Sequence, residues 1–359
     1  MDLLRRDPGL PQRSHTWLNA AAARGELLRL RRGIFVEAAA WETAPPWTRH
    51  RAEVAAAGLC DSAALLCRES ALAVHGIPLL DVPREVQLRA TSSSRAGLTP
   101  GRPLGSALLS ARPSGAQAIS TRPTRRVLPP VPRALTAAEA RQEYRRISES
   151  REWVPVPGIS VNGRPAVVGV EPLPFALTDV VPRMTRPAAV VALDAALARW
   201  ARERHSVPTQ TVLPEEWLWS LPAVQAWRWV RGFADARSES PGESWSRVLI
   251  HDLGFEPPQL QVEVQLPQGI ARVDFEWWGV FGEFDGRMKY TDAGTLSGLS
   301  DQSVYWNEKR REEQVEMVTG KRAARWGWED LRNPWMLEQK LLHRGVPRGS
   351  PRASTEKGL

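Results

Sequence analysis

The sequence has few cysteines and histidines, and their scarcity excludes several kinds of site. Only two cysteines occur, Cys60 and Cys67. On one helix they would lie about 10 Å apart, too far for a disulfide, so we expect two buried thiols in a reducing cytoplasm. The six histidines form neither an HExxH motif nor a Cys/His zinc pattern, so no structural or catalytic zinc ion is expected.

Long apolar runs are also missing. No stretch reaches the roughly 18 uncharged apolar residues that a membrane span needs, and residues 1–10 carry charges and prolines where a secretory signal needs an apolar core. We therefore expect a cytoplasmic protein that does not contact the membrane. The formal net charge of +8 favours a polyanionic partner such as DNA, although GC-biased codon usage gives the same arginine-rich composition.

Changes in composition along the chain predict an α+β or α/β multidomain protein. A chain of 359 residues is long enough for two or three domains, each with its own core. The expected order is an N-terminal winged helix (1–90), a loop-rich and then helical middle region (91–236), a C-terminal mixed sheet flanked by helices (237–345), and a disordered tail (346–359).

Local patterns predict the individual elements of the first two regions. At the N-terminus they indicate a helix, a tight hairpin, a second helix and a strand, at residues 14–24, 26–36, 62–74 and 85–90. In the middle region they indicate helices over residues 175–204, with breaks at Pro182 and Pro187, and over residues 215–236, where several tryptophans form a core stripe.

The segment from Ser240 onward carries the residues with chemical potential. Ser240, Pro241 and Glu243 have the pattern of a helix start, and strands are expected at residues 259–266, 271–277 and 280–285. A two-residue loop at Trp278-Gly279 would place Asp274 directly opposite Glu283. The other face of this hairpin is wholly apolar (Val273, Phe275, Trp277, Val280, Gly282 and Phe284) and is expected to be the core.

Two carboxylates opposite each other on a strand pair lie roughly 5 Å apart and repel. Asp285 adds a third acid, which Arg272 would partly neutralise, and a divalent cation with hard oxygen ligands would relieve more of the repulsion. Simpler interpretations remain open. Glu243 would only cap its helix or pair with Arg247, and Asp285 would only belong to a turn.

The same segment resembles the PD-(D/E)XK nucleases, specifically the branch related to very-short-patch-repair endonucleases. The similarity covers roughly residues 240–331, through GESWSRVLIHDLG, LQVEVQ, RVDFEW, GEFDGRMKY, EKRREEQV and RAARWGWEDL. It implies a small mixed sheet flanked by helices, with Mg²⁺ or Mn²⁺ as cofactor. The acids that would hold the metal are Glu243, Asp274 and Glu283.

One position departs from the family's pattern. The usual lysine would fall at position 285, where this chain has Asp285. Either Lys289 reaches back as its replacement, or Asp285 becomes another metal ligand. On the following helix, Arg311 matches a recurrent arginine that would steady the acids or a DNA phosphate, with Arg310 beside it, and Arg325 matches another in the last strand. A basic run among glutamates is also typical of a solvated helix face.

The first ninety or so residues resemble the winged-helix start of AbiEi-type antitoxins, best seen in GELLRLRRGIFV and RESALAVHGIPL. The resemblance implies DNA binding, with a helix in the major groove and a wing on the backbone. The candidate phosphate contacts are Arg24, Arg29, Arg31 and Arg32. A winged helix used for protein contacts is the alternative.

Together these features predict a Mg²⁺-dependent DNA endonuclease with an N-terminal DNA-binding module. The family resemblance adds a context of phage defence or of a toxin–antitoxin pair, with a cognate toxin or a second copy of the chain as partner. The alternative is a non-catalytic DNA-binding regulator with a degenerate nuclease domain, which Asp285 favours. A nicking or mismatch-repair activity is a third hypothesis. The sequence does not distinguish it from double-strand cleavage, because the choice of strands depends on oligomeric state.

Overall fold

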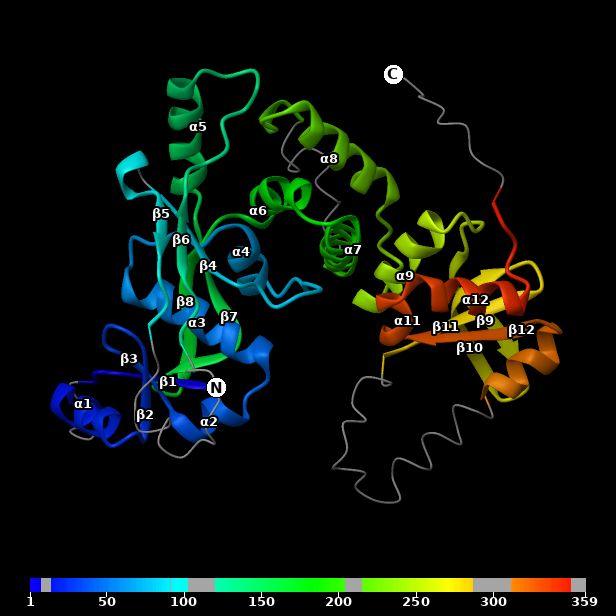
Figure 1. Ribbon diagram of the computed structural model, residues 1–359, viewed down its shortest axis with the longest axis horizontal. Coiled ribbons are helices and arrows are strands. Elements are labelled where there is room, and N and C mark those ends of the chain that lie inside the picture. Colours follow the sequence, from blue (N-terminus) through cyan, green and yellow to red (C-terminus); the bar gives the residue numbers. More distant parts are fainter. Residues whose placement is uncertain (8–13, 91, 103–119, 204–214, 287–310, 350–359) are drawn as a thin grey trace. The chain divides into compact units, whose positions relative to one another are not determined.

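The described part of the chain forms two compact units. The computed structural model describes residues 1–7, 14–90, 92–102, 120–203, 215–286 and 311–349. The first unit comprises Met1–Met184 with Pro208–Gly232, and the second comprises Thr185–Val207 with Phe233–Leu359 (Figure 1). Both combine helices with β-sheet, which confirms the predicted mixed, multidomain class. Among the described residues, no helix has the length and apolar character needed to cross a membrane.

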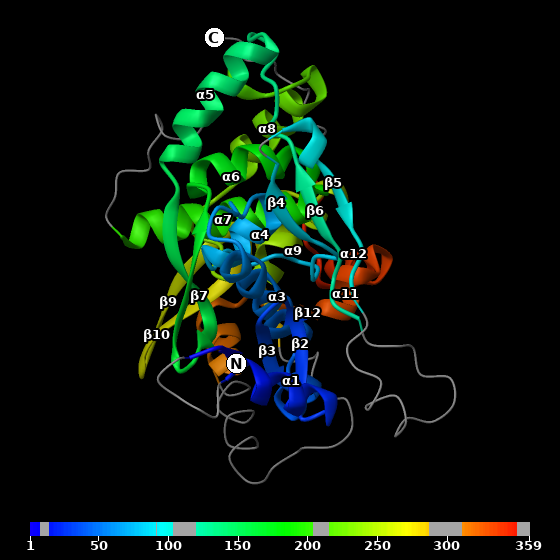
Figure 2. The same cartoon turned by 90° about the vertical axis from the view of Figure 1, so that its left-hand side faces the viewer.

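A five-stranded sheet in the first unit joins the N-terminal residues to a distant hairpin. Its order is β2 (Leu27–Arg31), β3 (Ile34–Glu37), β1 (Asp2–Arg5), β7 (Glu152–Val161) and β8 (Arg164–Val170). The predicted β2–β3 hairpin is confirmed, and α1 (His15–Ala23) packs beside it through a small apolar cluster (Figures 1 and 2). Because β7 and β8 follow residue 90, the N-terminal sheet is completed by strands from the middle region.

The first unit also contains a three-stranded sheet, in the order β4 (Val86–Arg89), β6 (Thr124–Val127) and β5 (Gly97–Thr99). The predicted strand at residues 85–90 is thus confirmed. The helices of this unit are α2 (Ala38–Thr43), α3 (Pro46–Cys60), α4 (Arg68–Val74), α5 (Ala137–Glu149), α6 (Leu173–Val180) and α8 (Leu221–Phe233). The helix predicted from Ser62 begins only at Arg68, because residues 65–66 extend to bond with strands on either side.

The two cysteines lie in different surroundings. Cys67 is buried, as predicted, and burial raises its pKa well above the ordinary value. Cys60 is exposed, because it is the last residue of α3, where the helix has left the core. The prediction of two buried thiols is therefore wrong for Cys60.

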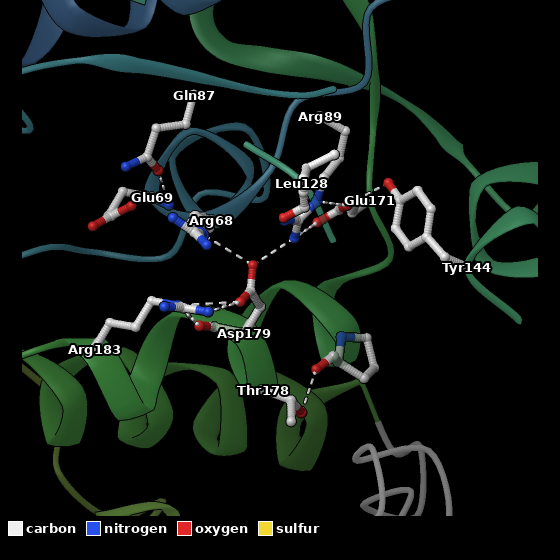
Figure 3. A network of polar contacts seen from close by, with 11 residues as sticks. Arg68, Glu69, Gln87, Arg89, Leu128, Tyr144, Glu171, Thr178, Asp179 and Arg183 are labelled. Carbon is white, nitrogen blue, oxygen red and sulfur yellow. Dashed lines mark hydrogen bonds and ion pairs between the residues drawn. The ribbon is translucent and has the colours of Figure 1, made fainter. Parts of the chain in front are cut away.

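A buried cluster of charged side chains lies among these elements (Figure 3). Arg89 donates to Glu171 from Nε at 2.5 Å and from Nη2 at 3.0 Å, and to Asp179 from Nη2 at 2.5 Å. Arg68 and Arg183 also contact Asp179, at 2.9 and 3.0 Å. The side chains of Arg89, Glu171 and Asp179 are no more than 2% exposed. This ion network ties β4, α4 and α6 together.

The two acids of the network differ in their electrostatic surroundings. Burial raises the pKa of Glu171, which contacts Arg89 and accepts a hydrogen bond from the Tyr144 hydroxyl at 2.8 Å. Burial acts on Asp179 in the same direction, but the guanidiniums of Arg89, Arg68 and Arg183 outweigh it and lower the pKa of that carboxyl. Asp179 is therefore held as a carboxylate, whereas Glu171 depends on Arg89 for its charge.

The second unit contains a mixed sheet, in the order β12 (Arg322–Gly327), β11 (Val280–Asp285), β10 (Gly269–Trp277) and β9 (Gln259–Leu266). The pairs β9–β10 and β10–β11 are antiparallel, and β11–β12 is parallel. The helices of this unit are α7 (Arg186–Arg202), α9 (Pro241–Asp252), α11 (Trp328–Arg332) and α12 (Pro334–Arg344). Helix α9 packs on α7, and α12 packs on β12 (Figure 1).

The two prolines predicted to break the helical region lie between α6 and the first turn of α7. Pro182 lies in a short 3₁₀ turn, as expected of a break, but Pro187 lies in the first turn of α7, where the missing N–H of proline has no cost.

The start of the predicted disordered tail is packed. Val346 is buried and Arg348 stacks on Phe255, so residues 346–349 pack on the rest of the second unit. Residues 350–359 lie outside the described residues.

The sheet of the second unit buries apolar residues on both faces. Phe275, Trp277 and Val280 belong to one core cluster, whereas Val273 and Phe281 belong to a second. Phe281 is only 2% exposed, because it packs with Val315 of the helical residues 311–319. The prediction of one apolar and one polar hairpin face is therefore wrong, since this helix covers part of the face that carries the acids.

Candidate functional site

Three predicted acids come together at the N-terminus of α9 and the facing strands. The β10–β11 register pairs Phe275 with Gly282 and Trp277 with Val280, as predicted. Asp274 comes just before Phe275 and Glu283 just after Gly282, and the charge of Asp274 raises the pKa of Glu283, so the two carboxyl groups are neighbours. Asp274 also accepts a hydrogen bond from the Phe284 amide at 2.9 Å, which fixes the orientation of its carboxyl group.

Glu243 joins this pair through a glutamine. Its Oε2 accepts hydrogen bonds from Gln261 Nε2 at 2.8 Å and from the Glu239 amide at 2.9 Å, and Gln261 also bonds to Asp274. Ser240 Oγ accepts from the Glu243 amide at 3.2 Å. Glu243 therefore contacts the start of its helix and also belongs to the acidic site, so capping is not its only contact. Its predicted i,i+4 pair is absent from the described contacts, where Arg247 instead binds Asp194 at 2.7 Å.

A glycine allows α9 to approach the sheet this closely. A Cβ on Gly242 would lie 1.9–2.4 Å from the ring of Phe284, next to Glu283. We expect Gly242→Ala to lower the free energy of unfolding by about 1–3 kcal/mol, because this overpacking outweighs the better helix propensity of alanine. Chemical denaturation measures the change. The control is Gly232→Ala in α8, where a Cβ meets nothing within 4 Å, and an equal loss in both variants would contradict the expectation.

Burial and mutual repulsion keep these acids protonated at unusually high pH. Burial, and then the charge of Asp274, raise the pKa of Glu243 to about 7 and that of Glu283 to about 8. The pKa of Asp274 is also raised, mainly by burial. Arg311 and Arg325 act in the opposite direction on Glu283 but do not cancel the effect. Such shifted carboxyl groups are typical of functional sites and are costly to a fold that does not use them.

These shifts predict that the free energy of unfolding falls as pH rises from about 4.5 to 8. In this range the unfolded chain has lost protons that folded Glu243 and Glu283 retain, because their ordinary pKa value is 4.5. The folded state then binds more protons, so its stability must fall with rising pH. Thermal unfolding in metal-free buffer measures this decline. Glu283→Gln should flatten it, and an equally steep decline in that variant would contradict the assignment.

The predicted arginines on the neighbouring elements lie close to Glu283. Arg311, Arg325 and Glu283 line one small cavity of about 90 Å³. Arg311 donates to the Arg272 carbonyl at 2.5 Å, and Arg325 forms an ion pair with Glu312 at 2.6 Å. Arg311 and Arg325 therefore lie beside Glu283, but each also binds another residue.

Of the remaining predicted residues of this site, the structure describes Asp285 and Arg272. Asp285 is half-buried at the end of β11. Arg272 forms its ion pair with Glu239, at 2.6 Å, so the structure does not bear out the expectation that it neutralises Asp285. The expectations for Lys289 and Arg310 lie outside the described residues.

The donor set suits a hard divalent cation, but the acids of the described residues are not arranged as a preformed metal site. Carboxylate and amide oxygens from Glu243, Asp274, Glu283 and Gln261 are ligands that Mg²⁺ and Mn²⁺ prefer. Within the described ranges, however, no three acidic, histidine or cysteine side chains are placed to hold a metal ion. Burial raises the pKa of Glu243, Asp274 and Glu283, so metal binding would have to displace protons from these carboxyl groups.

The four N-terminal arginines predicted to contact DNA phosphates take different positions in the first unit. Arg24 pairs with Glu26 at 2.6 Å. Arg31 is half-buried and donates to the Leu30 carbonyl and to the Thr124 hydroxyl. Arg29 and Arg32 are exposed and line a basic cavity. Only this second pair is therefore available to an external anion without breaking a contact to another side chain.

Comparison with family models, with curated proteins and with solved structures finds no match to this chain. The resemblances to very-short-patch-repair endonucleases and AbiEi-type antitoxins therefore stay predictions. Sequence reasoning missed Gln261, which joins two of the acids. In the sequence Gln261 is only a polar residue on the strand beside the acidic hairpin, and such residues are too common to identify a site.

Proposed function

We propose that the second unit is a Mg²⁺- or Mn²⁺-dependent endonuclease centre that hydrolyses DNA phosphodiester bonds. The observation that carries the proposal is the convergence of Glu243, Asp274 and Glu283, from three separate elements, in a site where burial raises the pKa of all three. Acids gathered in this way destabilise a fold unless a proton or a cation neutralises them.

The roles of the individual residues follow from their positions. Glu243, Asp274 and Glu283 would hold the metal ion, and the Gln261 amide would orient the first two carboxylates. When bound, a divalent cation activates water and stabilises charge on a scissile phosphate. Arg311 and Arg325, which line the same cavity as Glu283, would attract and orient the phosphate group. Asp285 would be an additional ligand at the position of the family's lysine.

A non-catalytic DNA-binding regulator is the second candidate, and two observations favour it. Asp285 stands where the resemblance calls for lysine, and among the described residues no three acidic, histidine or cysteine side chains are placed to hold a metal ion. In this function the exposed Arg29 and Arg32 would bind DNA phosphates, and the second unit would serve only for binding. A cognate toxin or a second copy of the chain would then be the natural partner, as the antitoxin resemblance implies.

A cleavage assay separates the two functions. The full chain is incubated with supercoiled plasmid, linear duplex and single-stranded DNA, with Mg²⁺, Mn²⁺ or a chelator, and the products are resolved by size. The nuclease requires cleavage that depends on metal and stops on chelation. Tight, salt-sensitive DNA binding without cleavage under any metal would favour the regulator.

A further inference from the structure

A basic cavity lies in the first unit, whereas the acidic site belongs to the second. The cavity has a volume of about 940 Å³, and the residues that line it come from the end of β1, the start of α1, the β2–β3 hairpin and the end of α3. They are Arg5, Arg6, His15, Asn19, Arg29, Arg32, Gly33, Phe35 and Cys60. A cavity of this size accommodates a whole nucleotide rather than a single ion.

The described residues that line this cavity carry charge of one sign. Four arginines line it, and among its described lining residues none carries a carboxylate. Arg29 donates weakly to the Arg31 carbonyl, at 3.4 Å, and lies 6.0 Å from the centre of the Phe35 ring. In the part of the chain that is described, none of the four guanidiniums forms an ion pair, whereas nearby Arg24 is paired with Glu26. Guanidiniums gathered without counter-charges repel, so an anionic ligand would stabilise them.

We propose that this cavity binds the clustered phosphates of one nucleotide-sized ligand. Guanidinium groups bind phosphate through paired N–H donors, and four of them match a ligand with several negative charges at one end. Two sources share this chemistry, a free nucleoside polyphosphate and the 5′-phosphorylated end of a nucleic-acid strand. The inference goes beyond the proposed nuclease centre, because it concerns another unit and requires no cleavage.

A cysteine in the cavity wall makes the binding measurable. Cys60 lines the cavity and is exposed, and Cys67, the other cysteine of the chain, is fully buried. A small alkylating reagent should therefore modify Cys60 selectively. A ligand seated among the arginines would shield the Cys60 thiol, so the alkylation rate reports occupancy directly. Cys60→Ser should abolish the fast alkylation and so confirms the site of the label.

The test measures Cys60 alkylation in the full-length protein by mass spectrometry, in chelator-containing buffer. The probes are ATP and a thymidine octamer with either a 5′-phosphate or a 5′-hydroxyl. A probe at about ten times its dissociation constant should slow alkylation about 10-fold. The double variant Arg29→Ala, Arg32→Ala should lose the protection, and the matched control Arg24→Ala should keep it.

Each outcome decides the proposal. Protection by ATP supports a free nucleotide as ligand, and protection by the phosphorylated octamer alone supports a strand end. The proposal is overturned if neither probe slows alkylation, if the double variant is protected like the wild type, or if both octamers protect equally while ATP does not. Because the buffer contains no free divalent metal, failure of the nuclease function would not alter this result.

Discussion

Asp274→Asn and Glu283→Gln are each expected to lower the rate of metal-dependent DNA cleavage by roughly 100-fold or more, because each removes a charge that would hold the cation. Both replacements keep the shape of the side chain, and both remove an acid whose pKa is raised by burial. The same variants should therefore unfold at a higher temperature than the wild type at pH 8. Loss of activity together with gain of stability is typical of a functional acid and not of a structural one.

A matched control lies on the same strand. Glu276 is two residues from Asp274 on β10, but it forms an ion pair with Lys321 at 2.5 Å. Glu276→Gln should therefore leave cleavage close to the wild-type rate. Unchanged cleavage in both Asp274→Asn and Glu283→Gln would reject the assigned centre, and equal losses in all three variants would point to a general effect on folding.

Arg89→Met is expected to lower the free energy of unfolding of the first unit by about 3–5 kcal/mol, because it leaves buried acids without a full set of partners. Glu171 is 0% exposed and has Arg89 as its charged partner, whereas Asp179 keeps Arg68 and Arg183. The unpaired charge should therefore appear at Glu171. Urea unfolding followed by tryptophan fluorescence measures the loss.

Two further variants make this prediction specific. Arg125→Met breaks an ion pair with Glu85 near the surface and should cause a much smaller loss, because water solvates both groups. Adding Glu171→Gln to Arg89→Met should restore part of the stability, since it removes the unpaired charge. An Arg89→Met protein as stable as Arg125→Met would show that the ion network does not hold β4, α4 and α6 together.

Local sequence patterns alone determined the turns, caps and hairpins of this protein, because these depend on residues that are close together in the chain. The Trp278-Gly279 turn fixes the β10–β11 register, which pairs Trp277 with Val280 and Phe275 with Gly282 and so brings Asp274 and Glu283 close together without reference to the rest of the chain. The Ser240 cap and the β2–β3 hairpin follow from equally short segments. An Asn162-Gly163 turn also marks the β7–β8 hairpin, so this missed element was predictable from sequence too.

Only the tertiary structure decided which of these segments meet. The helix of residues 311–319 covers Phe281 on the face that sequence pattern assigned to the acids, and Gln261 joins Glu243 to Asp274 from a third strand. The ion network of Arg89 and the arginine cavity likewise join residues far apart in the chain. The physical reason is that burial and charge at a point are sums over everything packed around it, and a periodic pattern reports only one segment at a time.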